Sequence, residues 1–180
     1  MSGHNKWTQI KRKKEITDKK RSQIFSKLLR TIAVAAKNDQ NPATNPQLRA
    51  AIARAKENSV PGENIERTIK RSGEAGDLES LIMEAYGPEG VAIIITATTN
   101  SKNRTVSEAR KIILDHHGKW ADPGSVLWAF RKEEDGWKAN FPQTISEGSG
   151  ADLGALIDAL DDHDDIDEIY TTAETIDANE

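Results

Sequence analysis

The stretch LIMEAYGPEGVAIIITATT, residues 81–99, contains two runs of apolar and β-branched residues separated by a turn sequence. The runs at 81–86 and 91–99 favour β-strands, because Ile, Val, Thr and Tyr side chains pack well on a pleated, half-buried surface. The residues between them, Gly-Pro-Glu-Gly at 87–90, are typical of a tight connection. This stretch therefore predicts a β-hairpin.

Downstream of residue 99 the hydrophobic pattern alternates between helical and strand-like periods. Val106, Ala109 and Ile113 share one face of a predicted helix, which Gly118 ends as a C-cap. The predicted elements are helices at 103–117 and 152–162 and strands at 125–132, 137–141 and 168–172.

The strand-like patterns at 125–132 and 137–141, with a turn at 133–136, predict a second hairpin. The side chains that alternate on one face of each strand are Val126, Trp128 and Phe130, then Trp137, Ala139 and Phe141. Counted from residue 91, the predicted order is β-α-β-β-α-β, with the strand at 81–86 added in front. This order is that of a ferredoxin-like α/β sandwich.

Upstream of residue 73 the hydrophobic pattern has the helical period. A first helix is expected to begin near Thr17 or Asp18, a second after the loop at 41–46, and a third after Pro61-Gly62. Three short amphipathic helices predict a small bundle. The expected fold class is therefore α+β, with an N-terminal three-helix bundle followed by the ferredoxin-like domain.

The segment 72–77, Ser-Gly-Glu-Ala-Gly-Asp, is small and polar, which is typical of a linker. We expect two domains: 1–73, a basic arm with the helical bundle, and 80–180, the α/β domain, joined by residues 74–79. The charge changes sign at the same point. Residues 1–73 contain 17 Lys and Arg against 6 Asp and Glu, whereas residues 74–180 contain 8 and 23.

The net charge of −4 thus combines +11 in the first part with −15 in the second. Clustered cations of this density favour binding to a polyanion, because they displace its condensed counterions. The alternatives are two solvated faces or two halves that neutralise each other. We expect nucleic acid on the basic domain and none on the acidic one.

Several function classes are not expected for this sequence. The chain has no Cys, so disulfides, thiolate metal sites and cysteine nucleophiles are absent. No segment approaches the roughly 18 apolar residues of a membrane helix. No nucleophile–base motif, phosphate-binding loop or dinucleotide fingerprint occurs. We therefore expect a cytoplasmic, non-enzymatic protein without membrane contact, metal or cofactor.

The candidate nucleic-acid-binding residues are Lys and Arg on the basic arm, on the outer face of the first helix and on the next two helices. Such side chains hold a phosphate backbone without reading sequence. Trp7 is added because it could stack on an unpaired base or, alternatively, staple the arm to the bundle. The candidates are Lys6, Trp7, Lys11, Arg12, Lys13, Lys14, Lys19, Lys20, Arg21, Lys27, Arg30, Arg49, Lys56, Arg67 and Lys70.

A second candidate anion site is Asn103, Arg104 and Thr105 at a predicted helix start. The alternative, an ordinary helix cap, is favoured because Asn and Thr are common capping residues. The acidic run at 161–165, Asp-Asp-His-Asp-Asp, is interpreted as a solvated helix end, since its consecutive side chains radiate around the helix and do not converge on a metal.

Several blocks of this sequence resemble the YebC/PmpR-type family, which includes mitochondrial translational activators. The blocks cover nearly the whole chain. They include Ser2-Gly3-His4, Lys6-Trp7, Asn45-Pro46, Leu48-Arg49, Tyr86-Gly87-Pro88, Gly90-Val91, Asn103-Arg104-Thr105, Gly124-Ser125-Val126, Trp128 and Phe130.

The resemblance implies a non-enzymatic regulator of gene expression, and family members are described both as DNA-binding transcriptional regulators and as ribosome-associated translation factors. Typical members carry a further small domain where this chain has only residues 133–149. The first expectation is a translation factor on ribosomal or transfer RNA, with a monomer favoured. A DNA-binding regulator using the same surface and a protein-interaction module using the acidic domain are the alternatives.

Overall fold

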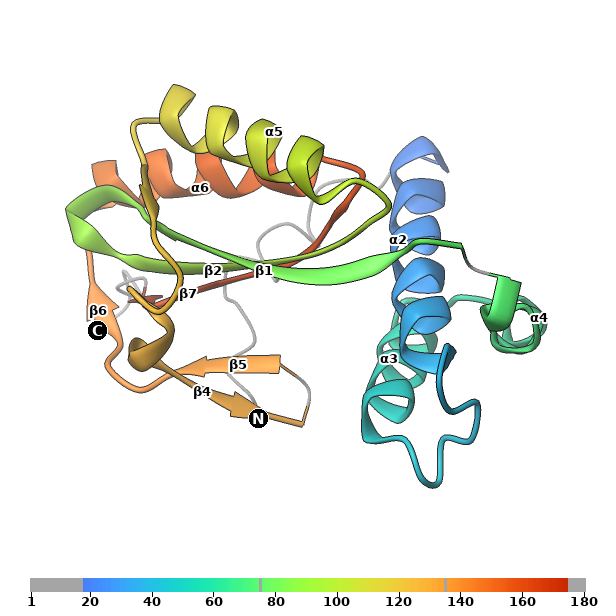
Figure 1. Ribbon diagram of the computed structural model, residues 1–180. Helices are drawn as coiled ribbons and strands as arrows, with labels where there is room; N and C mark the ends of the chain where they lie inside the picture. The colour runs from blue at the N-terminus through green and yellow to red at the C-terminus, as the bar shows by residue number, and fades with distance from the viewer. Residues whose placement is uncertain (1–17, 75, 135, 175–180) are drawn as a thin grey trace. The chain divides into compact units, whose positions relative to one another are not determined.

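The computed structural model describes residues 18–74, 76–134 and 136–174, which divide into two compact units (Figure 1). The first, called the helical unit, contains the described residues from 18 to 81 together with 98–102. The second, called the sheet unit, contains residues 82–97 and the chain from 103 onward. The charge change at Gly73 and this division in packing fall at different positions, since both strands of the first hairpin extend across the division. The expected α+β class is confirmed.

The helical unit is built from α2 (Asp18–Ala36), α3 (Pro46–Glu57) and α4 (Gly62–Lys70). The three helices share one core, in which Ile32, Leu48 and Ile65 come from different helices and are buried. Burial of each such side chain contributes about 1.5–3 kcal/mol. A short 3-10 helix, η1 (Ser72–Glu74), follows α4. The Ser72 hydroxyl donates to the carbonyl of Ile69 at 2.7 Å, and Ser72 is fully buried.

Asn45 determines where α3 begins. Its Oδ1 accepts the backbone N–H of Leu48 at 3.0 Å, while its Nδ2 donates to the carbonyls of Ala35 and Asp39 at 2.7 and 2.8 Å. One side chain therefore caps α3 and ties it to the end of α2. Pro46 follows at the first helical position, where its missing N–H costs no hydrogen bond.

The main sheet has four strands in the order β3-β1-β2-β7. They are β1 (Glu79–Tyr86), β2 (Ala92–Thr99), β3 (Lys119–Ala121) and β7 (Ile166–Thr171). β3 is antiparallel to β1, with Trp120 opposite Ala85, and β7 is antiparallel to β2, with Tyr170 opposite Ile94. The predicted hairpin of β1 and β2 is present, and the N–H of Gly87 donates to the carbonyl of Val91 across its turn.

Gly87 is required at this turn by a close approach. A Cβ there would lie 3.1 Å from Cδ1 of Ile93 and 3.2 Å from Cδ1 of Leu153. Both contacts are tighter than ordinary van der Waals packing, so a larger residue here requires the side chains of Ile93 and Leu153 to shift by a few tenths of an ångström.

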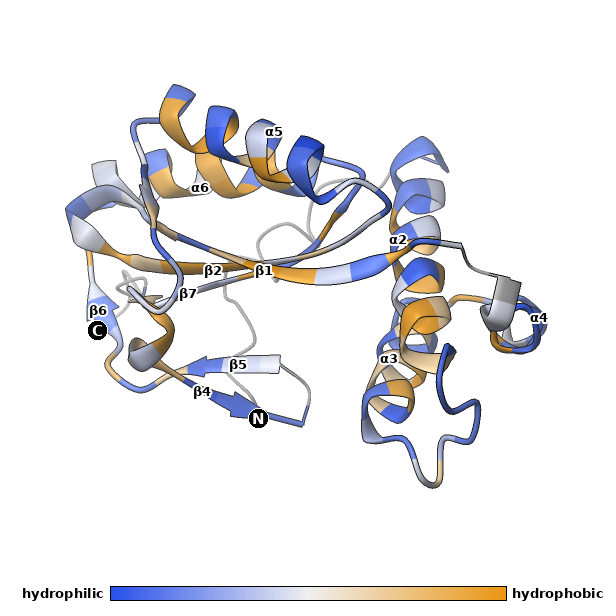
Figure 2. Ribbon diagram, viewed as in Figure 1, coloured by the Kyte–Doolittle hydropathy of each residue, from blue (hydrophilic) through white to orange (hydrophobic). Residues whose placement is uncertain are grey.

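Two helices, α5 (Lys102–Asp115) and α6 (Glu147–Asp161), cover one face of the sheet, and a small hairpin lies on the other (Figure 1). The hydropathy colouring shows the middle of β1 and β2 and much of α6 as hydrophobic (Figure 2). Side chains alternate along β2: Ile93 faces Leu153 of α6, whereas Ile94 joins a second cluster with Tyr170 and Phe130. The sheet unit therefore has apolar packing on both faces of its sheet.

The strand order differs from the predicted ferredoxin-like sandwich. The predicted hairpin at 125–141 exists as β4 (Phe130–Glu133) and β5 (Gly136–Ala139), but it forms a separate two-stranded sheet. Its place beside β2 is taken by β1, which is central and not an addition in front. The short strand β3 was not predicted. Alternation identifies a strand but not its partner, because backbone hydrogen bonds are the same in every pairing.

The predicted strand at 125–132 is interrupted by a 3-10 helix, η3 (Leu127–Ala129). The 3-10 turn rotates the side chains, so that Val126 and Phe130 are buried but Trp128 is 68% exposed. β5 ends at Ala139, before Phe141, which is 63% exposed. The expectation that Trp128 and Phe141 continue the alternation of their strands was therefore wrong.

The C-cap of α5 also differs from the prediction. The residue with left-handed backbone is His117, with φ of 61°, and Gly118 is the residue after it. The N–H of Gly118 bonds the carbonyl of Ile113 at 2.8 Å and that of His117 bonds Leu114 at 3.1 Å, as in a Schellman motif. Gly118 is needed because a Cβ would lie 3.1 Å from the carbonyl oxygens of Ile113 and Tyr86.

Glu84 of β1 is buried, and its carboxylate accepts backbone N–H groups from the loop that precedes β4. Oε1 accepts from Gly124 at 2.6 Å, and Oε2 accepts from Val126 at 2.7 Å and Leu127 at 3.1 Å. Three donors on one carboxylate offset the cost of burying its charge. This carboxylate therefore holds the loop and the hairpin against the sheet.

Replacing Glu84 by Gln should lower the free energy of unfolding by about 1–3 kcal/mol, because the amide NH₂ would face an N–H donor and leave it unpaired. Urea denaturation of both proteins measures the difference. Glu79→Gln, on the exposed end of the same strand, is the matched control and should change stability by less than about 0.5 kcal/mol. Equal effects of the two substitutions would contradict the role of Glu84.

Candidate nucleic-acid interface

The first turn of α2 carries three exposed cations, Lys19, Lys20 and Arg21. Asp18 is the acidic residue of this turn. The positive end of the helix dipole disfavours cations at this position and favours anions. The helix dipole therefore does not stabilise these three exposed cations, whereas an external anion would.

On α3 the exposed residues Arg49, Ala53 and Lys56 follow a spacing of four and three, which places them along one face. Arg49 Nη1 donates to the carbonyl of Pro42 at 2.9 Å, so part of its guanidinium is used within the loop before α3. Lys56 lies in the last turn, where the helix dipole favours a cation. This face is cationic, but Arg49 also stabilises the loop before α3 and Lys56 also stabilises the end of the helix.

On α4 the exposed cations are Arg67 and Lys70, followed by Arg71 at the C-cap. Arg67 Nη2 lies 3.0 Å from Glu63 Oε1 one turn earlier. An exposed pair of this kind contributes only about 0.3–0.5 kcal/mol, so it can exchange for another anion at low cost. Lys70 lies in the last turn of the helix.

Two predicted residues do not lie on the outer face. Lys27 is only 8% exposed and Arg30 is half-buried. Both flank the apolar stripe of α2, where long side chains lay their methylene groups along the core. The expectation that Lys27 is on the outer face was wrong. Lys6, Trp7, Lys11, Arg12, Lys13 and Lys14 lie outside the described residues.

The second candidate anion site is occupied by a carboxylate of the protein itself. Arg104 Nη2 lies 2.6 Å from Asp165 Oδ2, and the Thr105 hydroxyl donates to the same oxygen at 2.7 Å. Thr105 is fully buried and Asp165 is 6% exposed. The hydrogen bond and charge of Asp165 raise the pKa of Arg104 above its ordinary value. This arrangement joins the start of α5 to the start of β7 and does not support binding of an external anion.

The acidic run at 161–165 is only partly solvated. His163 Nε2 lies 2.7 Å from Glu108 Oε2 of α5, and the backbone N–H of Asp165 donates to His163 Nδ1 at 3.1 Å. The interpretation of this run as a solvated helix end was therefore wrong for His163 and Asp165. In residues 18–74, 76–134 and 136–174, no three His, Asp or Glu side chains are grouped so as to hold a metal ion.

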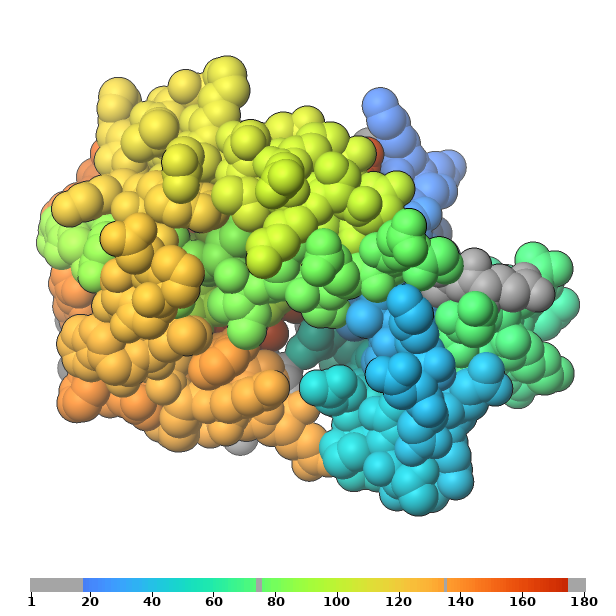
Figure 3. Space-filling model, viewed as in Figure 1, coloured from blue at the N-terminus to red at the C-terminus, as the bar shows by residue number. Residues whose placement is uncertain are grey.

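The sequence pattern missed one further feature, the exposed ring pair of Trp128 and Phe141. The space-filling view shows the segment that contains them, in orange, at the surface (Figure 3). One signal was available, since Pro142 after Phe141 has no N–H to donate and ends a strand. Among the helices of the described part of the chain, none is long and apolar enough to cross a membrane.

Comparison with family models matches most of the chain. A model described as "TACO1/YebC protein N-terminal domain" matches residues 5–75, and one described as "TACO1/YebC second and third domain" matches residues 78–134.

Curated relatives carry the name "Probable transcriptional regulatory protein". One from Pseudothermotoga lettingae is 49% identical in an alignment of 139 positions that covers 74% of this chain and 54% of the relative. One from Chlorobium chlorochromatii is 42% identical in an alignment of 181 positions that covers 97% of this chain and 70% of the relative. The chain thus spans about half the length of the first of these relatives, at 54%.

A solved structure with the same fold is the crystal structure of a conserved hypothetical protein, Aq1575, from Aquifex aeolicus. The TM-score is 0.76 and the sequence identity 28%, and the match covers 90% of this chain and 93% of that one.

The contacts around Asp165 predict different outcomes for two substitutions in α5. Thr105→Val should lower the free energy of unfolding by about 1–3 kcal/mol, because a buried hydrogen bond to a carboxylate is removed without a change in shape. Arg104→Gln should leave nucleic-acid affinity equal to that of Lys102→Gln, which removes an exposed cation two residues earlier. Urea denaturation measures the stability of Thr105→Val, and fluorescence anisotropy measures the nucleic-acid affinity of the other two variants. A loss of affinity in Arg104→Gln but not in Lys102→Gln would show that Arg104 does bind an external anion.

Proposed function

Since the chain belongs to the TACO1/YebC family, we propose that it is a non-enzymatic regulator of gene expression that binds nucleic acid through its helical unit. The observation that carries the proposal is the exposed cation cluster Lys19, Lys20 and Arg21 at the positive end of α2. These charges work against the helix that bears them, so a polyanion that neutralises them is favoured. Arg49, Lys56, Arg67 and Lys70 extend the cationic surface over α3 and α4.

The sheet unit supports the proposal by contrast, because several of its cations are engaged within the unit. Arg104 pairs with Asp165, Lys111 with Asp115, and Arg110 lies 4.8 Å from the ring centroid of Trp120. With a net charge of −15 over residues 74–180, this part of the chain repels a phosphate backbone as a whole. The affinity for a duplex or a folded RNA is therefore assigned to the helical unit.

The proposed ligand is ribosomal or transfer RNA, and the protein acts as a translation factor, as a monomer in the cytoplasm. The exposed residues of α2, α3 and α4 are mainly Lys, Arg and Glu, with few Asn and Gln to pair with base edges in a major groove. Such a surface suits recognition of shape and phosphate positions. The second candidate is a DNA-binding transcriptional regulator using the same surface, which the name of the curated relatives favours.

Removing the cation cluster should weaken binding in a salt-dependent way. If the full surface neutralises about 6–10 phosphates, affinity for a structured RNA should fall roughly 10³- to 10⁵-fold between 50 and 200 mM salt. The triple variant Lys19→Gln, Lys20→Gln, Arg21→Gln should reduce the slope of log K against log salt by about 0.7–0.9 for each phosphate that is no longer neutralised.

The matched control is the triple variant Lys102→Gln, Lys111→Gln, Lys119→Gln, which removes the same charge outside the cluster. It should leave the slope within error of the unmodified protein. Fluorescence anisotropy over a series of salt concentrations measures all three proteins. A slope that does not change in the cluster variant, or changes equally in both variants, would remove this surface from the proposal.

The choice between RNA and DNA is tested by crosslinking in cells, followed by sequencing of the nucleic acid bound to the full chain. We expect ribosomal or transfer RNA to be enriched over total RNA, and the cluster variant to lose that enrichment. Recovery of specific promoter DNA without RNA would replace the first candidate by the second.

A further inference from the structure

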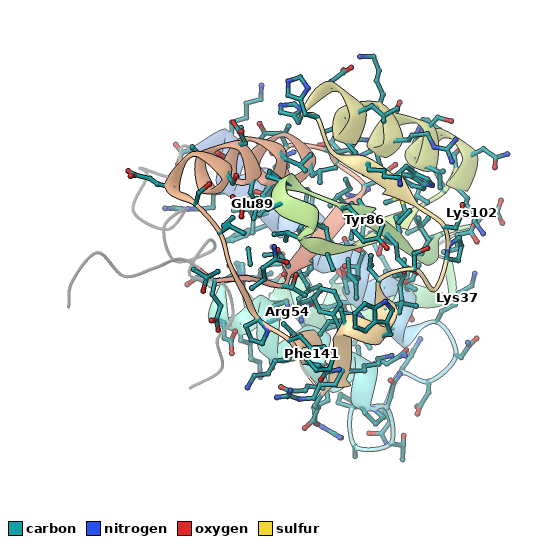
Figure 4. All side chains as sticks on the ribbon, turned by 90° about the vertical axis from the view of Figure 1, so that its left-hand side faces the viewer. Lys37, Arg54, Tyr86, Glu89, Lys102 and Phe141 are labelled. Carbon is teal, nitrogen blue, oxygen red and sulfur yellow. The ribbon has the colours of Figure 1, made fainter. Side chains whose placement is uncertain are left out.

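The largest exposed apolar side chains in the described part of the sheet unit include two aromatic rings that touch each other. Trp128 is 68% exposed and Phe141 63% exposed, and their ring centroids are 6.0 Å apart at an interplanar angle of 45°. Figure 4 labels Phe141 and shows it at the end of the small hairpin. Two large rings side by side in water are uncommon on a protein surface without a partner.

Both rings are held by hydrogen bonds of the surrounding backbone. Trp128 Nε1 donates to the carbonyl of Ser125 at 2.8 Å, in the loop that Glu84 fixes. The N–H of Asn140 donates to the carbonyl of Ala129 at 2.8 Å, and its Nδ2 lies 3.4 Å from the carbonyl of Trp128. The polar edge of the indole is thus used inside the protein, and its flat face is left to solvent.

Two cations lie on the exposed face of the same hairpin. Arg131 and Lys138 are directly opposite each other in the β4–β5 register, and both are exposed. Like charges directly opposite each other destabilise a strand pair. Arg131 Nε lies 3.0 Å from Glu133 Oε1 of the same strand, an exposed pair worth about 0–1 kcal/mol that can exchange for a phosphate. Arg131 Nη1 lies 3.5 Å from Asn140 Oδ1, next to the aromatic pair. Together with Lys132, Arg131 and Lys138 give residues 130–139 three cations against Glu133, Glu134 and Asp135, so this stretch is neutral in a part of the chain with a net charge of −15.

We propose that the Trp128–Phe141 pair is a stacking site for unpaired bases of single-stranded RNA, with Arg131 and Lys138 placed for the adjacent phosphates. Base–aromatic stacking needs flat exposed rings, and cations beside them suit the backbone of a nucleic acid. Because the indole N–H is already bonded, the site has no donor on its rings with which to select a base. It therefore binds without strong sequence preference.

This site goes beyond the proposed function, since it is a second contact, in the unit that carries the net negative charge. The choice of RNA over DNA rests on the proposed function; the stacking itself does not.

The test uses the full chain, a fluorescein-labelled U12 oligoribonucleotide and a dT12 oligonucleotide, at 50 mM salt. Trp128→Leu with Phe141→Leu keeps the apolar surface but removes the flat rings, and should weaken binding of U12 roughly 5- to 150-fold, as expected when one base no longer stacks. Trp128→Tyr with Phe141→Tyr keeps flat rings and should retain most of the affinity. Equal losses with dT12 are expected if stacking dominates; a loss with U12 alone assigns the site to RNA.

Leu114→Ala is the matched control, since Leu114 is an exposed apolar residue of α5 at 55% exposure. It should leave the affinity unchanged. Thermal unfolding of each variant shows whether the fold is retained. If the Leu variant is unstable, the RNA affinity of Trp128→Tyr with Phe141→Tyr still tests whether flat rings are sufficient for binding.

A zero-length photocrosslink provides the second measurement. U12 containing 4-thiouridine should crosslink to a peptide that contains Trp128 or Phe141, and the crosslink should persist in the variant that lacks Lys19, Lys20 and Arg21. That result separates this site from the helical unit, so a failure of the proposed function would leave it standing. The proposal would be overturned if the Leu variant kept its affinity and no crosslink formed in residues 127–141. It would also be overturned if the substitutions changed the sedimenting mass of the protein and left RNA binding unchanged.

Discussion

The arrangement of the sheet unit depends on one buried carboxylate. Glu84 extends from the central strand β1 and accepts the N–H groups of Gly124, Val126 and Leu127. Those three donors have no strand to pair with, because the chain turns there from β3 toward η3. The carboxylate thus accepts the loop's backbone N–H groups, which no neighbouring strand accepts. Its position determines where Val126 and Phe130 enter the core.

The same constraint determines what the protein exposes. The loop held by Glu84 positions the carbonyl of Ser125, which accepts both the Tyr86 hydroxyl at 3.2 Å and the indole N–H of Trp128 at 2.8 Å. Packing below the sheet and exposure of the aromatic pair are therefore two consequences of one anchored loop. In the helical unit Asn45 has a comparable role, since one amide fixes both the start of α3 and the end of α2.

Charge has different roles in the two units. In the sheet unit, the charges at Arg104, Asp165 and Glu84 are directed at partners within the fold. In the helical unit, Lys19, Lys20 and Arg21 lie where the helix dipole disfavours them. A charge that serves the fold has a partner within the protein that lowers its energy. A charge that lies where the fold does not stabilise it is a candidate for binding a ligand. By this criterion the start of α2 stands out, whereas Arg104 does not.

The sequence by itself determined the types and approximate limits of the main helices, the first hairpin and the opposite charges of the two parts, because hydrophobic period and charge depend on local order along the chain. Only the tertiary structure decided that β1 also pairs with β3, that Asp165 meets Arg104 and Thr105, and that Trp128 turns outward. Buried hydrogen bonds can join residues 60 positions apart in the sequence, as they do for Thr105 and Asp165. Their choice follows from which packing satisfies every buried polar group at once, and no local pattern contains that information.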